Sequence, residues 1–152
     1  MTTPTNGVFR QSGDGRPFTV GPSRVEVKVE GAETDGRFSI IQWEFPPGAP
    51  APPQHIHHDA SETFYVLEGE LEFPLGERIV KAGPGAALHI PAGTAHTISN
   101  PGTVVARALE IFCPGSLMGL VEEMGHIFAD GFPPDQARVQ AAFARFNSSL
   151  AK

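Results

Sequence analysis

Residues 46–69 limit what this chain can fold into more than any other segment does. The first part, PPGAPAPPQ (46–54), has five prolines, and because proline lacks the N–H that a β-ladder needs, we expect a stiff loop. The loop leads into HIHH, where His55 and His57 stand two residues apart. Side chains two apart on a strand share a face, so these two are predicted to point into the interior and His58 to point away.

A glutamate on an otherwise apolar strand face is the anomaly of this segment. Glu62 alternates with Phe64 and Val66, so the two-residue period puts its carboxylate in the interior. An unpaired buried carboxylate costs several kcal/mol, so a cation is expected beside it. With His96, from the later block HIPAGTAHTISN, the chain offers three imidazoles and one carboxylate, which suit Zn, Fe, Mn, Co or Ni. The plainer alternative is that the HxH pair is two ordinary strand histidines.

The rest of the chain predicts an all-β domain followed by two short helices. Alternating or β-branched runs bounded by Gly and Pro predict strands within 23–30, 37–45, 62–83 and 103–113. In the second of these runs, Trp43 is expected in the core. Apolar residues three or four apart then predict helices over 117–129 and 134–146. We therefore expect one domain, made of an N-terminal arm (1–21), a barrel (22–113) and a C-terminal helical segment packed on the barrel (114–152).

Charge and composition narrow the classes of partner. The formal net charge is −6 and the 11 basic residues are scattered singly, so no nucleic-acid contact is expected. No apolar run reaches the roughly 18 residues of a membrane span, and the N-terminal residues lack the apolar core of a signal peptide. The single cysteine, Cys113, provides no internal disulfide and is typical of a reducing cytoplasm; we expect it to be buried at a strand end.

Two blocks of the sequence resemble the two motifs of the cupin superfamily. The first block carries Gly48, His55, His57, Glu62 and Gly69, with six residues instead of the usual five between the first two. The second carries Gly85, Pro91, Gly93, His96 and Asn100 at every motif spacing. The short gap between the blocks is typical of small bacterial cupins. The resemblance implies a double-stranded β-helix of jelly-roll type, with His55, His57, Glu62 and His96 as the ligands of one divalent metal.

Within that superfamily, the phrases ETFYVLEGELEF and HIPAGTAHTISN and the C-terminal helices resemble small quercetin dioxygenase-like cupins. This resemblance implies a metal-dependent dioxygenase in which Glu62 is both a metal ligand and the base that takes the substrate hydroxyl proton. Two alternatives stay open. The first is a non-oxidative cyclase or isomerase that uses the metal as a Lewis acid, and the second is a small-molecule-binding sensor without turnover.

The strand faces next to the ligands suggest the kind of substrate. They carry Phe64, Val66, Phe73 and Ile98 as predicted pocket residues, with no Arg or Lys in register, so an apolar or aromatic small molecule is favoured over a phosphosugar. The same residues could serve as plain core. The roles of His89 and His126 stay open. Because small cupins usually dimerise through their sheets, the resemblance also implies a homodimer.

Overall fold

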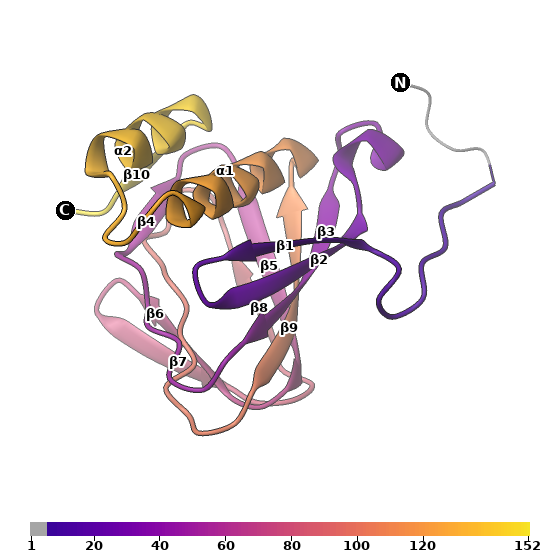
Figure 1. Cartoon of the computed structure of the whole chain (residues 1–152), viewed down its shortest axis with the longest axis horizontal. Coiled ribbons are helices and arrows are strands. Elements are labelled where there is room, and N and C mark those ends of the chain that lie inside the picture. The colour runs from indigo at the N-terminus through magenta and orange to yellow at the C-terminus, as the bar shows by residue number, and fades with distance from the viewer. Residues whose placement is uncertain (1–5) are drawn as a thin grey trace.

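The computed structural model describes residues 6–152 and shows a β-barrel flanked by two helices (Figure 1). The larger sheet contains, in spatial order, β1 (Arg16–Val20), β2 (Ser23–Val29), β3 (Ser39–Phe45), β9 (Ala106–Cys113), β5 (Ser61–Glu68) and β8 (Ala87–Ile90). Two smaller sheets complete the barrel: β6 (Leu71–Leu75) pairs with β7 (Arg78–Ala82), and β4 (His55–His57) pairs with β10 (Ser148–Leu150). All of these pairings are antiparallel. The predicted all-β jelly-roll fold with two C-terminal helices is confirmed.

The two-residue period of the central strands builds the core. Along β9, for example, Ala106, Ala108 and Phe112 are buried at alternate positions. The buried apolar residues of β3 and β5 follow the same rule, and they are Ile41, Trp43, Phe45, Phe64 and Val66. An antiparallel sheet with one buried face needs this alternation, because a slip by one residue would expose every apolar side chain.

Asn100, the last residue of the second sequence block, hydrogen-bonds to two loops of the barrel. Asn100 is 1% exposed, and its Nδ2 donates toward the carbonyl oxygens of Phe45 and Pro46, both at 3.1 Å, and of Val104 at 2.8 Å. Its Oδ1 accepts from the backbone N–H of Gly102 at 3.1 Å. An amide can satisfy buried donors and acceptors at once, which explains this residue type at a site enclosed by backbone.

The helices pack at the side and end of the barrel (Figure 1). Helix α1 (Met118–Ala129) lies against β1, while α2 (Gln136–Arg145) packs on α1 and on β10. Two short 3-10 helices, η1 (Gly31–Thr34) and η2 (Gly115–Leu117), lie in the connections. Asp135 caps α2, with its Oδ1 accepting from the N–H groups of Ala137 and Arg138. No helix of residues 6–152 is long and apolar enough to cross a bilayer.

Three features differ from the expectations. The segment 1–21 is not only an arm: its described part contains β1, which pairs with β2 and forms the edge of the large sheet, whereas residues 1–5 lie outside the described part. The C-terminal segment is not only helical, because it ends in β10. Cys113 is exposed, not buried, because it continues the outward series of β9 that begins at Arg107. The expected homodimer stays a prediction.

Gly69 offers a test of this packing. It has φ +72°, and a Cβ built on it would lie 2.8 Å from Cα and Cβ of Ala106. Gly76 also has positive φ, +61°, but a Cβ there would meet nothing within 4 Å. We expect Gly69→Ala to lower the unfolding free energy by about 1–3 kcal/mol more than Gly76→Ala, because only the first adds a steric clash to the backbone strain. Urea denaturation of both variants measures this, and equal losses would contradict the described approach of Gly69 to β9.

Candidate metal centre

Two histidines from different parts of the chain are held opposite each other by the backbone. His55 N–H donates to His96 O, and His96 N–H donates to His55 O, both at 3.0 Å. This is the closely spaced pair of an antiparallel ladder, so both side chains project to the same face. His57 follows on that face of β4, and its carbonyl accepts from Gly93 N–H at 2.8 Å, which fastens the second-block loop to the strand.

The three imidazoles form a compact cluster. Their ring centroids lie 4.5–5.2 Å apart, and one ring nitrogen from each lies within 4.8 Å of the others. His57 and His96 are buried, with exposed fractions of 4% and 3%. Burial lowers the pKa of His55 to about 4, with a further contribution from His96, so His55 is neutral at neutral pH. Neutral imidazole is the form that binds a metal.

Hydrogen bonds on the outer side of the rings determine which nitrogen faces the cluster. Nδ1 of His55 lies 3.2 Å from Pro53 O, and Nδ1 of His96 lies 2.8 Å from Thr94 O. Because a carbonyl oxygen only accepts, both Nδ1 atoms must carry a proton, and Nε2 is left for the interior. His57 follows the same pattern, with Nδ1 at 2.6 Å from Ser148 Oγ.

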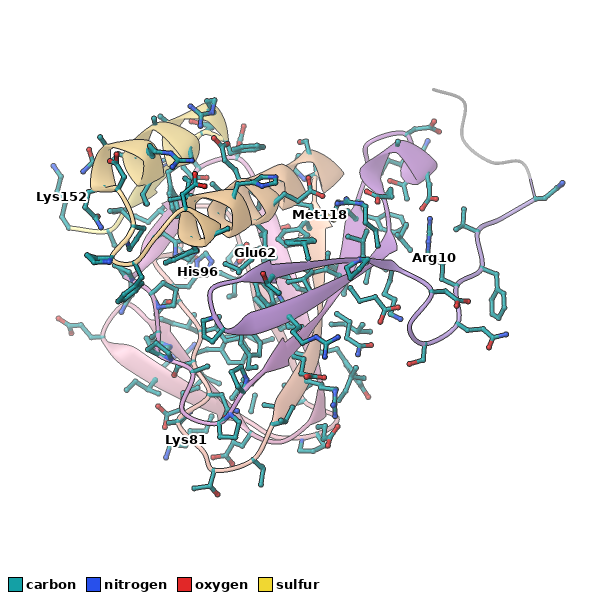
Figure 2. All side chains as sticks on the ribbon, viewed as in Figure 1. Arg10, Glu62, Lys81, His96, Met118 and Lys152 are labelled. Carbon is teal, nitrogen blue, oxygen red and sulfur yellow. The ribbon has the colours of Figure 1, made fainter. Side chains whose placement is uncertain are left out.

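Glu62 lies beside two of these inward nitrogens. Its Oε1 is 3.1 Å from Nε2 of His57, and its Oε2 is 2.7 Å from Nε2 of His96. Both Nε2 atoms are nevertheless buried without a hydrogen bond of good geometry. Figure 2 shows Glu62 and His96 together in the interior, behind α1 and β1. Buried polar atoms without partners are rare in proteins, so this arrangement needs an explanation that the protein alone does not give.

Electrostatics keep the carboxylate charged. Burial alone would raise the pKa of Glu62, but the imidazoles of His57 and His96 outweigh burial and hold this pKa below the ordinary range of a glutamate. Burial also opposes the charged form of His96, but contact with Glu62 outweighs it and raises the pKa of His96. A metal ion would therefore have to displace a proton from His96 at acidic pH.

A second buried carboxyl, which the sequence analysis missed, lies next to this group. Glu110 on β9 is 4% exposed, and it accepts a hydrogen bond at 2.5 Å from Nε1 of Trp43, which is buried as expected. Burial, and next the charge of Glu62, raise the pKa of Glu110 well above its ordinary value. The centre thus holds two carboxyls whose pKa values are displaced in opposite directions, that of Glu62 downward and that of Glu110 upward. The signal was present in the sequence, since Glu110 alternates with Ala108 and Phe112 as Glu62 does with Phe64.

These residues fit a metal ion. Three nitrogens with free lone pairs and one carboxylate match the donor sets of Zn and of redox-active first-row metals, and they leave positions for water or substrate in a five- or six-coordinate ion. The structure clusters His55, His57 and His96 as a potential metal site. Glu62 stays a predicted fourth ligand, and the identity of the metal is open.

The other histidines lie away from the cluster. His58 is exposed, and its Nε2 lies 3.0 Å from Ser149 Oγ. His89 is exposed, with Nδ1 at 2.8 Å from Thr63 Oγ1, and His126 is exposed on α1. The structure therefore brings none of these three into the metal centre.

The predicted pocket residues lie in or against the core. Phe64, Val66 and Phe73 are at most 3% exposed, and the rings of Phe64 and Phe73 lie 5.0 Å apart. Ile98 is half-buried and packs against the core cluster to which these three residues belong. Their role as substrate contacts stays a prediction.

A surface cavity of about 330 Å³ shares two lining residues with the surroundings of the metal centre. It is lined by Leu75, Arg78, Leu88, His89, Ile90, Pro91 and Thr94. Ile90 pairs with Glu62 across β5 and β8, and Thr94 is the carbonyl partner of His96. Arg78 is an arginine in this lining, although the strand faces next to the ligands predicted no Arg or Lys in register.

Comparisons with known proteins agree with the motif resemblance. Residues 41–112 match a family model described as "Cupin domain". Over 87 residues, 57% of this chain, the sequence is 32% identical to quercetin 2,3-dioxygenase of Bacillus subtilis (strain 168), and the match covers 26% of that enzyme. The chain thus spans about a quarter of the length of this curated relative.

Solved structures show the same fold. A predicted oxalate decarboxylase from Thermotoga maritima superposes with a TM-score of 0.65 at 17% identity, over 70% of this chain and 99% of that one. The polyketide cyclase RemF from Streptomyces resistomycificus superposes with a TM-score of 0.61 at 23% identity, over 72% and 80%. Identities this low establish a shared architecture, not a shared reaction.

Elemental analysis of untagged protein tests the metal centre. We expect about one transition-metal ion per chain, largely lost in His57→Ala or His96→Ala, because each variant removes a ligand atom from the cluster. His58→Ala is the matched control, since this neighbouring histidine is exposed and should leave the metal content unchanged. Equal metal content in all variants would place the ion elsewhere.

The raised pKa of Glu110 predicts a pH-dependent stability. Above its ordinary value of 4.5, the unfolded chain releases this proton while the folded chain keeps it, so folding stability falls as pH rises. Relative to Glu110→Gln, wild type should lose unfolding free energy above about pH 4.5, at up to about 1.4 kcal/mol per pH unit. Denaturation across pH 4–8 measures this, with exposed Glu70→Gln as the control expected to follow wild type. Parallel curves for wild type and Glu110→Gln would show that Glu110 is ionised in the folded protein.

Proposed function

This chain belongs to the cupin superfamily, and within it we propose a metal-dependent enzyme that acts on an apolar or aromatic small molecule, most simply as a quercetinase-like dioxygenase that uses O2. The observation that carries the proposal is the convergence of three imidazoles that each use Nδ1 in an outward hydrogen bond, two of which, His57 and His96, place Nε2 beside the buried carboxylate of Glu62. The similarity to quercetin 2,3-dioxygenase supports the choice of reaction.

The residues of the centre have two proposed roles, which are to hold a metal ion and to accept a proton. A divalent transition metal held there would supply a Lewis acid, and O2 chemistry would be open only to a redox-active ion. The outward hydrogen bonds of His55, His57 and His96 fix the orientation of the three rings, so that Nε2 of each faces the position of the ion. Glu62 accepts the proton of the substrate hydroxyl at a carboxylate oxygen. Because neighbouring imidazoles lower the pKa of Glu62, it is a weak base, so it suits a hydroxyl that is already acidic, as in phenols and flavonols.

The apolar walls favour a substrate with little charge. Phe64, Val66 and Phe73 surround the interior without a fixed cation, and such walls exclude water from reactive anions. We propose the cavity beside Ile90 as the entrance, because its walls include the strand partner of Glu62 and the carbonyl partner of His96. Arg78 at this cavity could contact a single anionic substituent.

The buried pair of carboxyls favours a second candidate function. Glu62 and Glu110 have pKa values displaced in opposite directions, and such a pair can accept a proton at one group and donate one from the other. This suits a non-oxidative cyclisation or isomerisation, in which protons move but O2 is not consumed. The structural likeness to RemF is one of fold and does not choose between the two reactions.

An oxygen-electrode screen of flavonols and catechols with metal-loaded protein tests the proposal. We expect O2 uptake with turnover, and Glu62→Gln should keep its metal but lose about 100-fold or more in turnover, as for removal of a general base. Full activity in Glu62→Gln would eliminate the base role. Turnover without O2 uptake would favour the non-oxidative reaction, and tight ligand binding without turnover under air would favour a sensor.

A further inference from the structure

The C-terminal strand runs along the strand that carries two of the clustered histidines. β10 pairs with β4 so that Ser148 lies opposite His57 and Leu150 opposite His55. Backbone hydrogen bonds extend the pairing on both sides, from His58 N–H to Asn147 O at 3.0 Å and from Ala151 N–H to Gln54 O at 2.8 Å. The C-terminal strand β10 therefore lies beside the strand that carries His55 and His57 (Figure 1).

One side chain of this strand reaches the centre. Ser148 is 7% exposed, and its Oγ lies 2.6 Å from Nδ1 of His57. The same Oγ donates its proton to Phe146 O at 2.9 Å. A hydroxyl has a single proton, so Ser148 must accept from His57, and Nδ1 of His57 must carry the hydrogen. The lone pair of His57 is consequently on Nε2, the nitrogen that faces Glu62.

His57 depends on this distant contact in a way that the other two histidines do not. Nδ1 of His55 and Nδ1 of His96 bond to carbonyl oxygens only two residues earlier in the chain, at Pro53 and Thr94. Those partners are present whenever the local loop is formed. The partner of His57 is 91 residues away and arrives only when β10 docks on β4.

We propose that Ser148 is a positioning residue for the metal centre, which keeps His57 in the Nδ1–H tautomer and so directs Nε2 to the ion. The proposal rests on the metal centre of the proposed function. Docking of the C-terminal strand thereby completes the ligand set. Phe143 of α2 adds to this support, because its ring packs edge-on against His55 with centroids 5.4 Å apart.

Ser149 provides a matched control on the same strand. Its Oγ lies 3.0 Å from Nε2 of His58, the exposed histidine next to His57. Ser149→Ala removes a serine–histidine contact without touching the cluster. Ser148→Thr keeps the hydroxyl and should restore what Ser148→Ala loses.

The first measurement is the affinity for Co²⁺ alone, by competition with a chromophoric chelator. We expect Ser148→Ala to bind Co²⁺ about 10–100-fold more weakly than wild type, as for loss of a hydrogen bond to a ligating histidine. Ser149→Ala and Ser148→Thr should stay close to wild type. Wild-type affinity in Ser148→Ala would overturn the proposal.

The second measurement needs no metal. Long-range ¹H–¹⁵N NMR correlations of the imidazoles in metal-free protein report the tautomer of each histidine directly. His57 should be protonated at Nδ1 in wild type and in Ser149→Ala, and should lose this preference in Ser148→Ala while His96 keeps it. An unchanged His57 tautomer in Ser148→Ala would overturn the positioning role. Wild-type protein that binds no Co²⁺ would instead overturn the proposed metal centre, so the two failures are distinguishable.

Discussion

The structure depends on gathering three imidazoles, two of them buried, and a buried carboxylate at one place in an apolar barrel. Each imidazole is tied on its outer side, His55 to Pro53 O, His96 to Thr94 O and His57 to Ser148 Oγ. These bonds use the Nδ1 protons and leave three nitrogens facing inward, where Nε2 of His57 and of His96 has no hydrogen-bond partner. A folded protein pays for such unpaired groups, and a bound cation removes the cost.

Burial and the neighbouring groups of this centre also shift the pKa values of the two buried carboxyls. The imidazoles beside Glu62 lower the pKa of that carboxyl, whereas burial, and next the charge of Glu62, raise the pKa of Glu110. Nε1–H of Trp43, on the adjacent strand β3, donates a hydrogen bond to the Glu110 carboxyl and fixes its position. One barrel therefore holds two neighbouring carboxyls with oppositely displaced pKa values, which is compatible with oxygenase chemistry and with non-oxidative proton transfer.

Local periodicity was sufficient to predict much of the centre. The two-residue period placed His55, His57 and Glu62 on the inward face. His96 belongs to an isolated bridge, so no strand period placed it there; the need of Glu62 for a cation and the motif resemblance supported its role. Glu110 and the exposure of Cys113 were readable from the alternation of β9. Ser148 was not, because the short strand SSL has no apolar alternation and its contact spans 91 residues. Contacts of that kind are set by tertiary docking, which a local pattern does not encode.

X-ray absorption spectroscopy of untagged, metal-loaded protein tests the central claim most directly. The described hydrogen bonds predict about three imidazole nitrogens at about 2.0–2.1 Å from the ion, with multiple scattering from the rings, and oxygen in the remaining positions. A spectrum without imidazole scattering, or one with sulfur from Cys113 in the coordination shell, would contradict it.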